Sequence, residues 1–336
     1  MREFKLWKFI ASELQTGKRI SLMIVAASNR SSPGRAGFKM AVTENTKCYG
    51  TIGGGIMERN LIKKAPDLII GNKKIIIKKL YHNPNSSFET SGLICGGNQT
   101  IIIINLAKSD LTIVKKIIDG FNKGEKATLC ITPLGLKYAS EVYDKRSINF
   151  NYNTENDWEY CESYGMPDTI YIIGGGHVGL AVAHAMSTLD FRIFTFDPRK
   201  DVFTVKQNIY SNKIFNIPYE KVGEFIEEGN RSYVVILTSE MNTDIIALKS
   251  IIKKNVGYIG LMGSKVKIKK IFNSLTQEEF DPKLFDKISA PIGIEIYAET
   301  PEEIAVSIAA EIIKTKYNDS KKSFTALDRK TPLRAG

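Results

Sequence analysis

Apolar residues in the first half of the chain follow two spacings. Phe4, Trp7, Ala11 and Leu14 recur every three or four residues, which predicts an amphipathic helix. The apolar run at 20–27 predicts a buried strand. Further strands are expected at 38–42, 47–51, 74–80, 100–105 and 127–132, and helices at 56–64 and between the last two strands.

The second half alternates strand-like and helix-like segments. A last helix is expected at 301–316, because Thr300 can cap it and Pro301 suits its first position. Strands alternating with helices are typical of a mostly parallel sheet covered on both faces. Strands are expected at 169–173, 192–196, 213–217, 232–238 and 256–261, and helices at 177–189, 220–228, 243–254 and 265–274.

These patterns predict an α/β protein, in which an N-terminal mixed α/β domain precedes a C-terminal Rossmann-like, doubly wound parallel sheet. A length of 336 residues suits two domains. The stretch before residue 169 is polar, rich in Asn and without clean periodicity. We expect a first domain at 1–140, a linker at 141–168, the Rossmann-like domain at 169–317 and a polar, basic tail at 318–336.

The distribution of apolar residues also bears on location. The longest uninterrupted apolar stretch, 22–27, is far shorter than the roughly 18 residues that a membrane-spanning helix needs. Residues 1–18 carry charges among their apolar positions, unlike a signal peptide. We therefore expect a cytoplasmic protein with no membrane partner.

The net charge of +11 raises nucleic acid, a membrane surface or an anionic small molecule as a partner. The lysine pairs are scattered along the chain, however, and no nucleic-acid-binding motif accompanies them. A coding bias toward Lys, Ile and Asn explains this charge equally well. We expect no nucleic-acid partner.

The four cysteines are far apart and form no C-x-x-C pair, so a zinc ribbon is not expected and a reducing compartment fits. Cys48 and Cys130 lie in apolar strands and are expected in the core, while Cys161 falls in the expected linker. Cys95 lies among glycines. Its thiol is either held on an accessible loop, where it could bind a soft metal or accept sulfur, or buried and inert.

A glycine-rich loop opens the second half. Gly174, Gly176 and Gly179 fit G-x-G-x-x-G between a strand and a helix, and Asp197 ends the next strand 18 residues after Gly179. Such glycines allow a tight turn and close approach of a pyrophosphate to the helix N-terminus, while the acid accepts from a ribose hydroxyl. Arg199 leaves the choice between NAD and NADP open, and tight packing without any dinucleotide is also compatible.

His177 lies within this loop, where it could donate to a phosphate or act as an acid, although the backbone already provides donors. His184, two turns later, is expected to be a packed or surface histidine. Three histidines in the chain are too few for a histidine-rich metal site.

The first half contains a second glycine loop before a helix, Gly53, Gly54 and Gly55, with Glu58 in the first helical turn. Backbone N–H groups here could hold an anion. A tight turn in which Glu58 complements the helix dipole remains the alternative.

Taken together, these blocks resemble the XdhC/CoxI family of xanthine dehydrogenase accessory proteins. In the first half the resemblance rests on Ser31-Ser32-Pro33-Gly34-Arg35, on Gly50 to Gly55 with Glu58, and on Cys95-Gly96-Gly97. In the second half it rests on Gly174 to Val178, Asp197-Pro198-Arg199, Tyr258 to Lys265, Pro291-Ile292-Gly293 and Thr300 to Ala305. The blocks occur in order and cover most of the chain up to about Lys316.

The resemblance implies a factor that binds the molybdenum cofactor (molybdopterin), works with a cysteine desulfurase to exchange an oxo for a sulfido ligand, and inserts the cofactor into a xanthine-dehydrogenase-like molybdenum hydroxylase. It implies no substrate turnover, so we expect no catalytic residues. A homodimer is expected. On this resemblance Cys95 is the thiol near the metal, and Arg35 and the first glycine loop with Glu58 face the pterin phosphate.

The full set of expected cofactor-binding residues is Arg35, Gly53, Gly54, Gly55, Glu58, Cys95, Gly96, Gly97, Gly174, Gly176, His177, Gly179, Asp197, Arg199, Ser264 and Lys265. Two positions depart from the family pattern. Phe38 replaces an expected small residue, and Lys265-Val266-Lys267 replaces an arginine-richer stretch. A lysine can still serve a phosphate, but without the bidentate geometry of arginine.

Two other function classes stay open. An NAD(P)-dependent oxidoreductase would use the second glycine loop, although the first domain shows no obvious acid–base set. A non-catalytic scaffold would keep its Rossmann domain empty and use it for protein contact.

Overall fold

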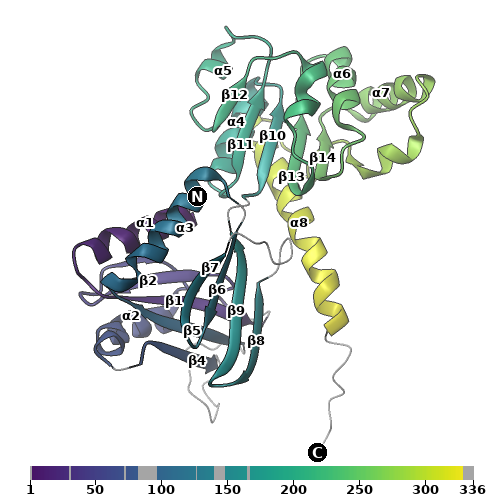
Figure 1. The fold of residues 1–336 in the computed structure, drawn as a ribbon. Coiled ribbons are helices and arrows are strands. Elements are labelled where there is room, and N and C mark those ends of the chain that lie inside the picture. Colours follow the sequence, from purple (N-terminus) through teal and green to yellow (C-terminus); the bar gives the residue numbers. More distant parts are fainter. Residues whose placement is uncertain are drawn as a thin grey trace, which may run out of the picture. The chain divides into compact units, whose positions relative to one another are not determined.

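The computed structural model describes residues 2–29, 32–71, 73–81, 97–125, 127–139, 148–164 and 167–327, with side chains from residue 3 to residue 317. The chain divides into two compact units, an N-terminal unit (Met1–Met166) and a C-terminal unit (Pro167–Gly336), each described by itself below. Both are α/β, as the sequence predicts (Figure 1).

The N-terminal unit contains two antiparallel sheets and three α-helices among its described residues. Sheet A has the strand order β3-β2-β1-β5-β4, and sheet B has the order β7-β6-β9-β8. The elements are α1 (Arg2–Gln15), β1 (Ile20–Ser28), β2 (Lys39–Thr43), β3 (Cys48–Gly50), α2 (Gly55–Ile70), β4 (Ile75–Tyr81), β5 (Asn98–Leu106), η1 (Lys108–Asp110), α3 (Leu111–Lys123), β6 (Ala127–Thr132), β7 (Gly135–Ala139), β8 (Asn149–Thr154) and β9 (Asp157–Tyr164).

Sheet A is covered on both faces, which explains why β1 is a continuous apolar run. Alternate residues such as Leu22 and Ile24 pack with α1, α3 and sheet B, while Met23 and Val25 pack against α2 on the opposite face. Figure 1 shows α2 on one side of this sheet and α1 and α3 on the other. The loops at the ends of β1, β2 and β5 are therefore anchored to a sheet that packs against a hydrophobic core on each face.

Residues 149–164, expected within a linker, instead form β8 and β9 of sheet B. Trp158 and Tyr160 alternate inward along β9 and complete the core of the N-terminal unit. In the sequence, the Asn-rich composition around Trp158 and Tyr160 hides the alternation of inward and outward residues that is typical of a strand. The unit boundary lies at 166/167.

The C-terminal unit is a parallel sheet with the strand order β12-β11-β10-β13-β14-β15, in which the first three strands run opposite to chain order and the rest follow it. This is the Rossmann order. The elements are β10 (Thr169–Ile173), α4 (His177–Ser187), β11 (Arg192–Phe196), α5 (Phe203–Lys206), β12 (Lys213–Phe215), η2 (Tyr219–Phe225), β13 (Gly229–Ile236), α6 (Met241–Ile251), β14 (Val256–Leu261), α7 (Lys265–Gln277), η3 (Pro282–Lys287), β15 (Ile288–Ser289) and α8 (Pro301–Leu327).

Helices cover both faces of this sheet. Residues of α4 and α8 form the core on one face, and residues of η2, α6 and α7 form it on the other. Strand order reverses between β10 and β13, so the loops after these strands diverge and leave a crevice where ligands of this fold bind. No helix in the described residues is long and apolar enough to span a bilayer.

Several helices differ from their predicted extents, among them α2, η2 and α8. α2 continues past Pro66 to Ile70, because Ala65 and Ile69 are buried and their packing outweighs the cost of the proline. The segment expected to be an α-helix at 220–228 is the 3₁₀-helix η2. α8 continues to Leu327, so the expected tail begins inside a helix that no Gly or Pro interrupts.

Candidate functional site

The glycine loop of the N-terminal unit is closed by the acid that follows it. Gly53, Gly54 and Gly55 all have positive φ, at 128°, 76° and 70°. Oε2 of Glu58 accepts hydrogen bonds from the Ile52 N–H at 2.9 Å, the Gly54 N–H at 3.0 Å and the Thr51 hydroxyl at 2.6 Å. Glu58 therefore holds the loop and uses the amides that an anion would need.

Three motif segments that are distant in sequence meet at this loop. A Cβ on Gly34 would lie 2.0 Å from the Ile52 carbonyl oxygen and 2.1 Å from Nε2 of Gln99, so only glycine fits there. Gln99 is fully buried and donates from Nε2 to the same carbonyl at 3.0 Å. Gly53 packs directly on the backbone of Gly34. We call this junction the loop cluster.

The loop cluster is also tied to the start of β5. The Ser32 hydroxyl donates to the Asn98 carbonyl at 3.1 Å, and the Asn98 N–H donates to Oδ1 of Asn29 at 3.2 Å. Gly97 immediately precedes this point and is buried. Cys95 and Gly96, the expected metal ligand and its neighbour, lie outside the described residues.

Two polar groups give the loop cluster its chemistry. Arg35 is exposed and donates from Nη1 to the Asn29 carbonyl at 3.3 Å. Oε1 of Gln99 is buried and accepts no hydrogen bond from the residues that the structure describes. A buried acceptor without a donor is costly, and a ligand N–H would satisfy it. Sequence reasoning missed Gln99, since nothing in a strand pattern distinguishes it.

A buried charged network lies beside the same loop. Nζ of Lys39, on β2, donates to Glu3, to Oε2 of Glu162 at 2.8 Å and to the Gly37 carbonyl at 3.1 Å. Burial raises the pKa of Glu162 to about 7; the nearby carboxylate of Glu3 adds to this rise, and Lys39 opposes it. The hydroxyl of Tyr160 also donates to Glu162, at 2.9 Å. A proton can therefore be held at Glu162 near neutral pH.

The three motif glycines in the loop of the C-terminal unit have different structural roles. A Cβ on Gly174 would lie 2.7 Å from the Leu237 carbonyl oxygen, and a Cβ on Gly179 would lie 2.1 Å from the Gly174 carbonyl oxygen. A Cβ on Gly176 would meet nothing within 4 Å among the described residues. The first and third glycines thus serve packing, whereas the second leaves open space at the N-terminus of α4, where a phosphate can approach backbone N–H groups.

Asp197 does not fit the ribose-binding role expected for it. Its carboxylate is fully buried, and Oδ2 accepts from the Gly175 N–H at 2.8 Å and from Nη2 of Arg199 at 2.7 Å. Oδ1 accepts from the N–H and Nε of Arg199. Burial alone would raise the pKa of Asp197, but these hydrogen bonds outweigh it and lower the pKa. Both carboxylate oxygens are already used inside the protein, so Asp197 has no oxygen left for a ribose hydroxyl.

The remaining expected residues of the C-terminal unit have mixed roles. His177 is exposed at the start of α4, while His184 is exposed and stacks on Tyr210 with ring centroids 4.3 Å apart. The Ser264 hydroxyl accepts from the Lys267 N–H at 3.2 Å and so caps α7, and Lys265 is exposed beside it.

Sequence reasoning missed an ion pair between two helix starts. The fully buried Asp244, on α6, lies 2.5 Å from Nζ of Lys267, on α7. Burial raises the pKa of Asp244, and Lys267 opposes this. An acid in the first turn of a predicted helix is too common to be a signal.

The cysteines correct two expectations. Cys48 is exposed on the edge strand β3 and is not in the core. Cys130 and Cys161 are paired across β6 and β9 and form a disulfide, so the four cysteines are not all free thiols. The strand β9 lies in the expected linker, which is why its pairing with β6 could not be anticipated.

Two family models match the chain. The one described as the XdhC and CoxI family matches residues 13–77, and the one described as the XdhC Rossmann domain matches residues 170–312. Together they cover more than half of the chain. The first match contains Gly34, Gly53 and Glu58, and the second contains the G-x-G-x-x-G loop.

Two curated proteins are similar to this chain at less than 30% sequence identity. The chain is 23% identical over 301 residues to the uncharacterized protein YqeB of Escherichia coli K12, covering 88% of this chain and 43% of that protein. It is 27% identical over 148 residues to a protein of Bacillus subtilis described as a probable xanthine dehydrogenase subunit, covering 44% of this chain and 42% of that protein. The matches thus span about two fifths of the length of these relatives.

A crystal structure of a xanthine dehydrogenase from Bacillus halodurans has a TM-score of 0.72 to this structure, at 19% identity, and the match covers 100% of this chain and 98% of that one. At this identity the likeness shows a shared fold.

Proposed function

Since this chain belongs to the XdhC and CoxI family, we propose that it is an accessory factor for a xanthine-dehydrogenase-like molybdenum hydroxylase. In this role it binds molybdenum cofactor as cargo, supports its sulfuration and delivers it to the hydroxylase in the cytoplasm. The cargo would bring the molybdenum and its exchangeable oxo ligand, and the protein would supply binding and protection.

The loop cluster is the observation that carries this proposal. Gly34 and Gly53 come from two separate motifs, Gln99 lies two residues after a third, and the three residues pack together at one junction. Gly34 and Gly53 allow this close backbone packing, whereas a Cβ on Gly54 would meet nothing within 4 Å among the described residues, so a ligand has room at that position of the loop. In this proposal Cys95, which lies outside the described residues, would supply a thiol donor for the soft metal.

The polar groups of the loop cluster fit an anionic pterin. The exposed Arg35 is suited to a phosphate, because its guanidinium can form two parallel hydrogen bonds. Oε1 of Gln99 offers an acceptor to a ring N–H. Glu58 binds the loop and not the ligand, so its contribution is to position the glycines.

The C-terminal unit supports the same function less directly. The open space at Gly176 favours a phosphate at the N-terminus of α4. The rival assignment, an NAD(P)-dependent oxidoreductase, loses support because the acid expected to bind ribose is occupied by Arg199 and Gly175. A non-catalytic scaffold with an empty Rossmann domain would bind no phosphate-containing ligand at this loop. A cysteine desulfurase partner and a homodimer belong to the proposal.

Anaerobic titration of the full-length protein with isolated molybdenum cofactor tests the proposal, with NAD and NADP titrated in parallel. We expect saturable cofactor binding that Arg35→Ala weakens roughly tenfold, as for loss of a charge-assisted hydrogen-bond pair. Cys95→Ala should keep the fold and shorten cofactor retention. Lys116→Ala, an exposed cation on α3, is the matched control.

Binding of a nicotinamide nucleotide alone would contradict the proposal and return the oxidoreductase assignment. Cofactor binding that is unchanged in Arg35→Ala would move the site away from the loop cluster. Retention unchanged in Cys95→Ala would remove this thiol from the metal site.

A further inference from the structure

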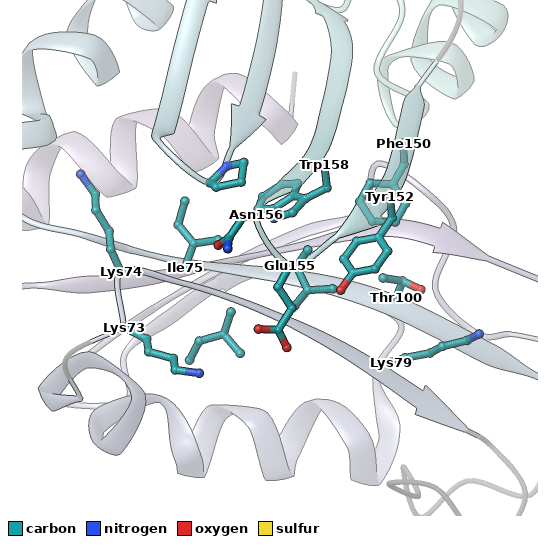
Figure 2. Close-up of a pocket in the computed structure, with 13 residues that line it drawn as sticks. Lys73, Lys74, Ile75, Lys79, Thr100, Phe150, Tyr152, Glu155, Asn156 and Trp158 are labelled. Atoms are coloured by element: carbon teal, nitrogen blue, oxygen red, sulfur yellow. The ribbon is translucent and has the colours of Figure 1, made fainter.

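A pocket of about 780 Å³ lies in the N-terminal unit, away from the loop cluster. It opens where β4 forms the outer edge of sheet A and faces the β8–β9 hairpin of sheet B. Its size is within the roughly 300–1,000 Å³ typical of small-molecule sites. Residues that line it include Lys73, Lys79, Phe150, Tyr152, Glu155 and Trp158 (Figure 2).

The alternation of β4 builds one wall. Ile75 and Ile77 pack toward the core shared with sheet B, and strand geometry places Lys73 and Lys79 on the same side of the chain. Figure 2 shows these two lysines at opposite ends of the group of lining side chains. The wall is therefore apolar in its middle and cationic at both ends.

Aromatic side chains of β8 and β9 form the other wall. Trp158 is 6% exposed and anchored in the core, whereas Tyr152 is 48% exposed and accessible to a ligand. Phe150 lies beside Tyr152, with ring centroids 6.3 Å apart. A planar ring can stack on such a surface, and every heteroaromatic ring offers a π face for it.

Hydrogen-bonding groups lie between the two walls. Glu155 and Asn156 occupy the turn between β8 and β9, and Thr100 lines the pocket from β5. Figure 2 shows the Glu155 and Tyr152 side chains between the two lysines. A carboxylate accepts from ring N–H and amino groups, and an amide both donates and accepts.

We propose that this pocket binds a planar nitrogen heterocycle that carries a phosphate. The ring lies between Tyr152 and the isoleucines of β4, its N–H edge meets Glu155 or Asn156, and its phosphate pairs with a lysine at the end of β4. Lysines on an edge strand also discourage edge-to-edge association. That role needs neither an aromatic wall nor a pocket, and both are present here.

The pocket is separate from the loop cluster because Thr100 and Gln99 are successive residues of β5 and point to opposite faces of sheet A. The inference therefore does not depend on the proposed function. Nucleoside monophosphates and pterin phosphates share the required chemistry, and only a binding comparison separates these two sources.

Calorimetric titration of the full-length protein with GMP, CMP and a pterin monophosphate tests the inference. Tryptophan fluorescence, which comes from Trp158 in the pocket and from the fully buried Trp7, is followed alongside. We expect saturable binding of at least one of these probes. Tyr152→Ala should weaken it roughly tenfold through lost stacking, and the double variant Lys73→Ala/Lys79→Ala by a similar factor. Thermal unfolding of each variant checks that the fold is kept, and Lys116→Ala is the control.

Tightest binding of a nucleotide or of the pterin identifies the source of the ligand. Failure of all three probes to bind saturably, or binding that the two pocket variants leave unchanged, overturns the inference. Arg35→Ala should not alter this binding, so loss of cofactor binding at the loop cluster and loss of ligand binding in this pocket are distinguishable results.

Discussion

The two glycine loops of this protein look alike in sequence and differ in structure. Each follows a strand, precedes a helix and is held by a carboxylate that accepts from loop N–H groups, Glu58 in one unit and Asp197 in the other. Glu58 is half-buried and comes from the helix itself, whereas Asp197 is fully buried, comes from the neighbouring strand and is paired with Arg199. In both units the acid beside the glycine loop therefore stabilises the loop conformation by accepting hydrogen bonds from its N–H groups.

The difference also concerns what each loop offers to a ligand. In the C-terminal unit the amide held by the acid belongs to Gly175, and the second motif glycine faces open space. In the N-terminal unit the acid accepts from the amides of Ile52 and Gly54, and the ligand contacts that we propose are made by Arg35 and Gln99 instead. The Rossmann loop is suited to a phosphate, and the other loop to shaping a junction.

Removing the buried acid should have the largest effect. We expect Asp197→Ala to lower the free energy of unfolding by about 3 kcal/mol, because it leaves the Gly175 N–H and the Arg199 guanidinium without their acceptor. Urea denaturation monitored by circular dichroism measures this change. Asp201→Ala, an exposed acid nearby that pairs with Lys206, should change it by less than about 0.5 kcal/mol. Equal effects would contradict the fastening role of Asp197.

Glu162 and Asp197 should contribute with opposite signs to the pH dependence of stability. The pKa of Glu162 is raised to about 7, so the folded state binds more protons than the unfolded state above the ordinary value of 4.5. Stability from this group is therefore lost as pH rises from about 4.5 to 7, by up to about 2–3 kcal/mol. Asp197, whose pKa is lowered, contributes stability that is lost as pH falls through its folded-state pKa.

Glu162→Gln separates these two contributions. The variant cannot titrate at this position, so its unfolding free energy should lack the decline between about pH 4.5 and 7. Denaturation curves of the wild type and the variant at several pH values provide the comparison. Parallel pH profiles for the two proteins would show that Glu162 does not hold a proton in the folded state.

Alanine substitutions at Gly179 and Gly176 test whether the first serves packing and the second leaves space for a ligand. Gly179→Ala should cost about 2 kcal/mol, because its Cβ would lie 2.1 Å from the Gly174 carbonyl oxygen. Gly176→Ala should cost less than about 0.5 kcal/mol, since no described atom lies within 4 Å of its Cβ, but it should weaken any phosphate ligand bound above it. Similar melting temperatures for the two variants would overturn this assignment.

A smaller effect than that of the buried Asp197 is expected at the half-buried Glu58. Glu58→Ala should cost about 1 kcal/mol, the size of a lost helix-capping interaction. Because Glu58 shapes the loop cluster, the variant should also weaken cofactor binding. Asp119→Ala, an exposed acid on α3, serves as the control for charge alone. Full stability in Glu58→Ala would mean that the glycines hold the loop without it.

Strong local patterns predicted most of the fold. The strands at 127–132, 169–173, 192–196 and 256–261 have the expected bounds, since unbroken apolar runs between turn residues leave little choice. The hairpin of β8 and β9 was missed because its outward residues are polar and its neighbours are rich in Asn. α2 extends beyond its predicted end because burial of Ala65 and Ile69 overrides the local effect of Pro66.

The candidate site was predictable in part. The glycine motifs mark where the backbone must turn tightly, and these turns are present. The role of Asp197 was not predictable, because its partner Arg199 is only two residues away and could equally have pointed to a ligand. The disulfide of Cys130 and Cys161 and the sharing of Lys39 by Glu3 and Glu162 also depend on contacts between distant segments.

The sequence by itself determined the fold class, the Rossmann-type loop and the family to which the chain belongs, because these depend on periodicity and on ordered blocks of residues. Only the tertiary structure decided which polar groups are buried and paired. Hydrogen-bond donors and acceptors are satisfied across the fold, so no linear pattern records that both carboxylate oxygens of Asp197 are paired inside the protein, or that Oε1 of Gln99 has no donor among the described residues.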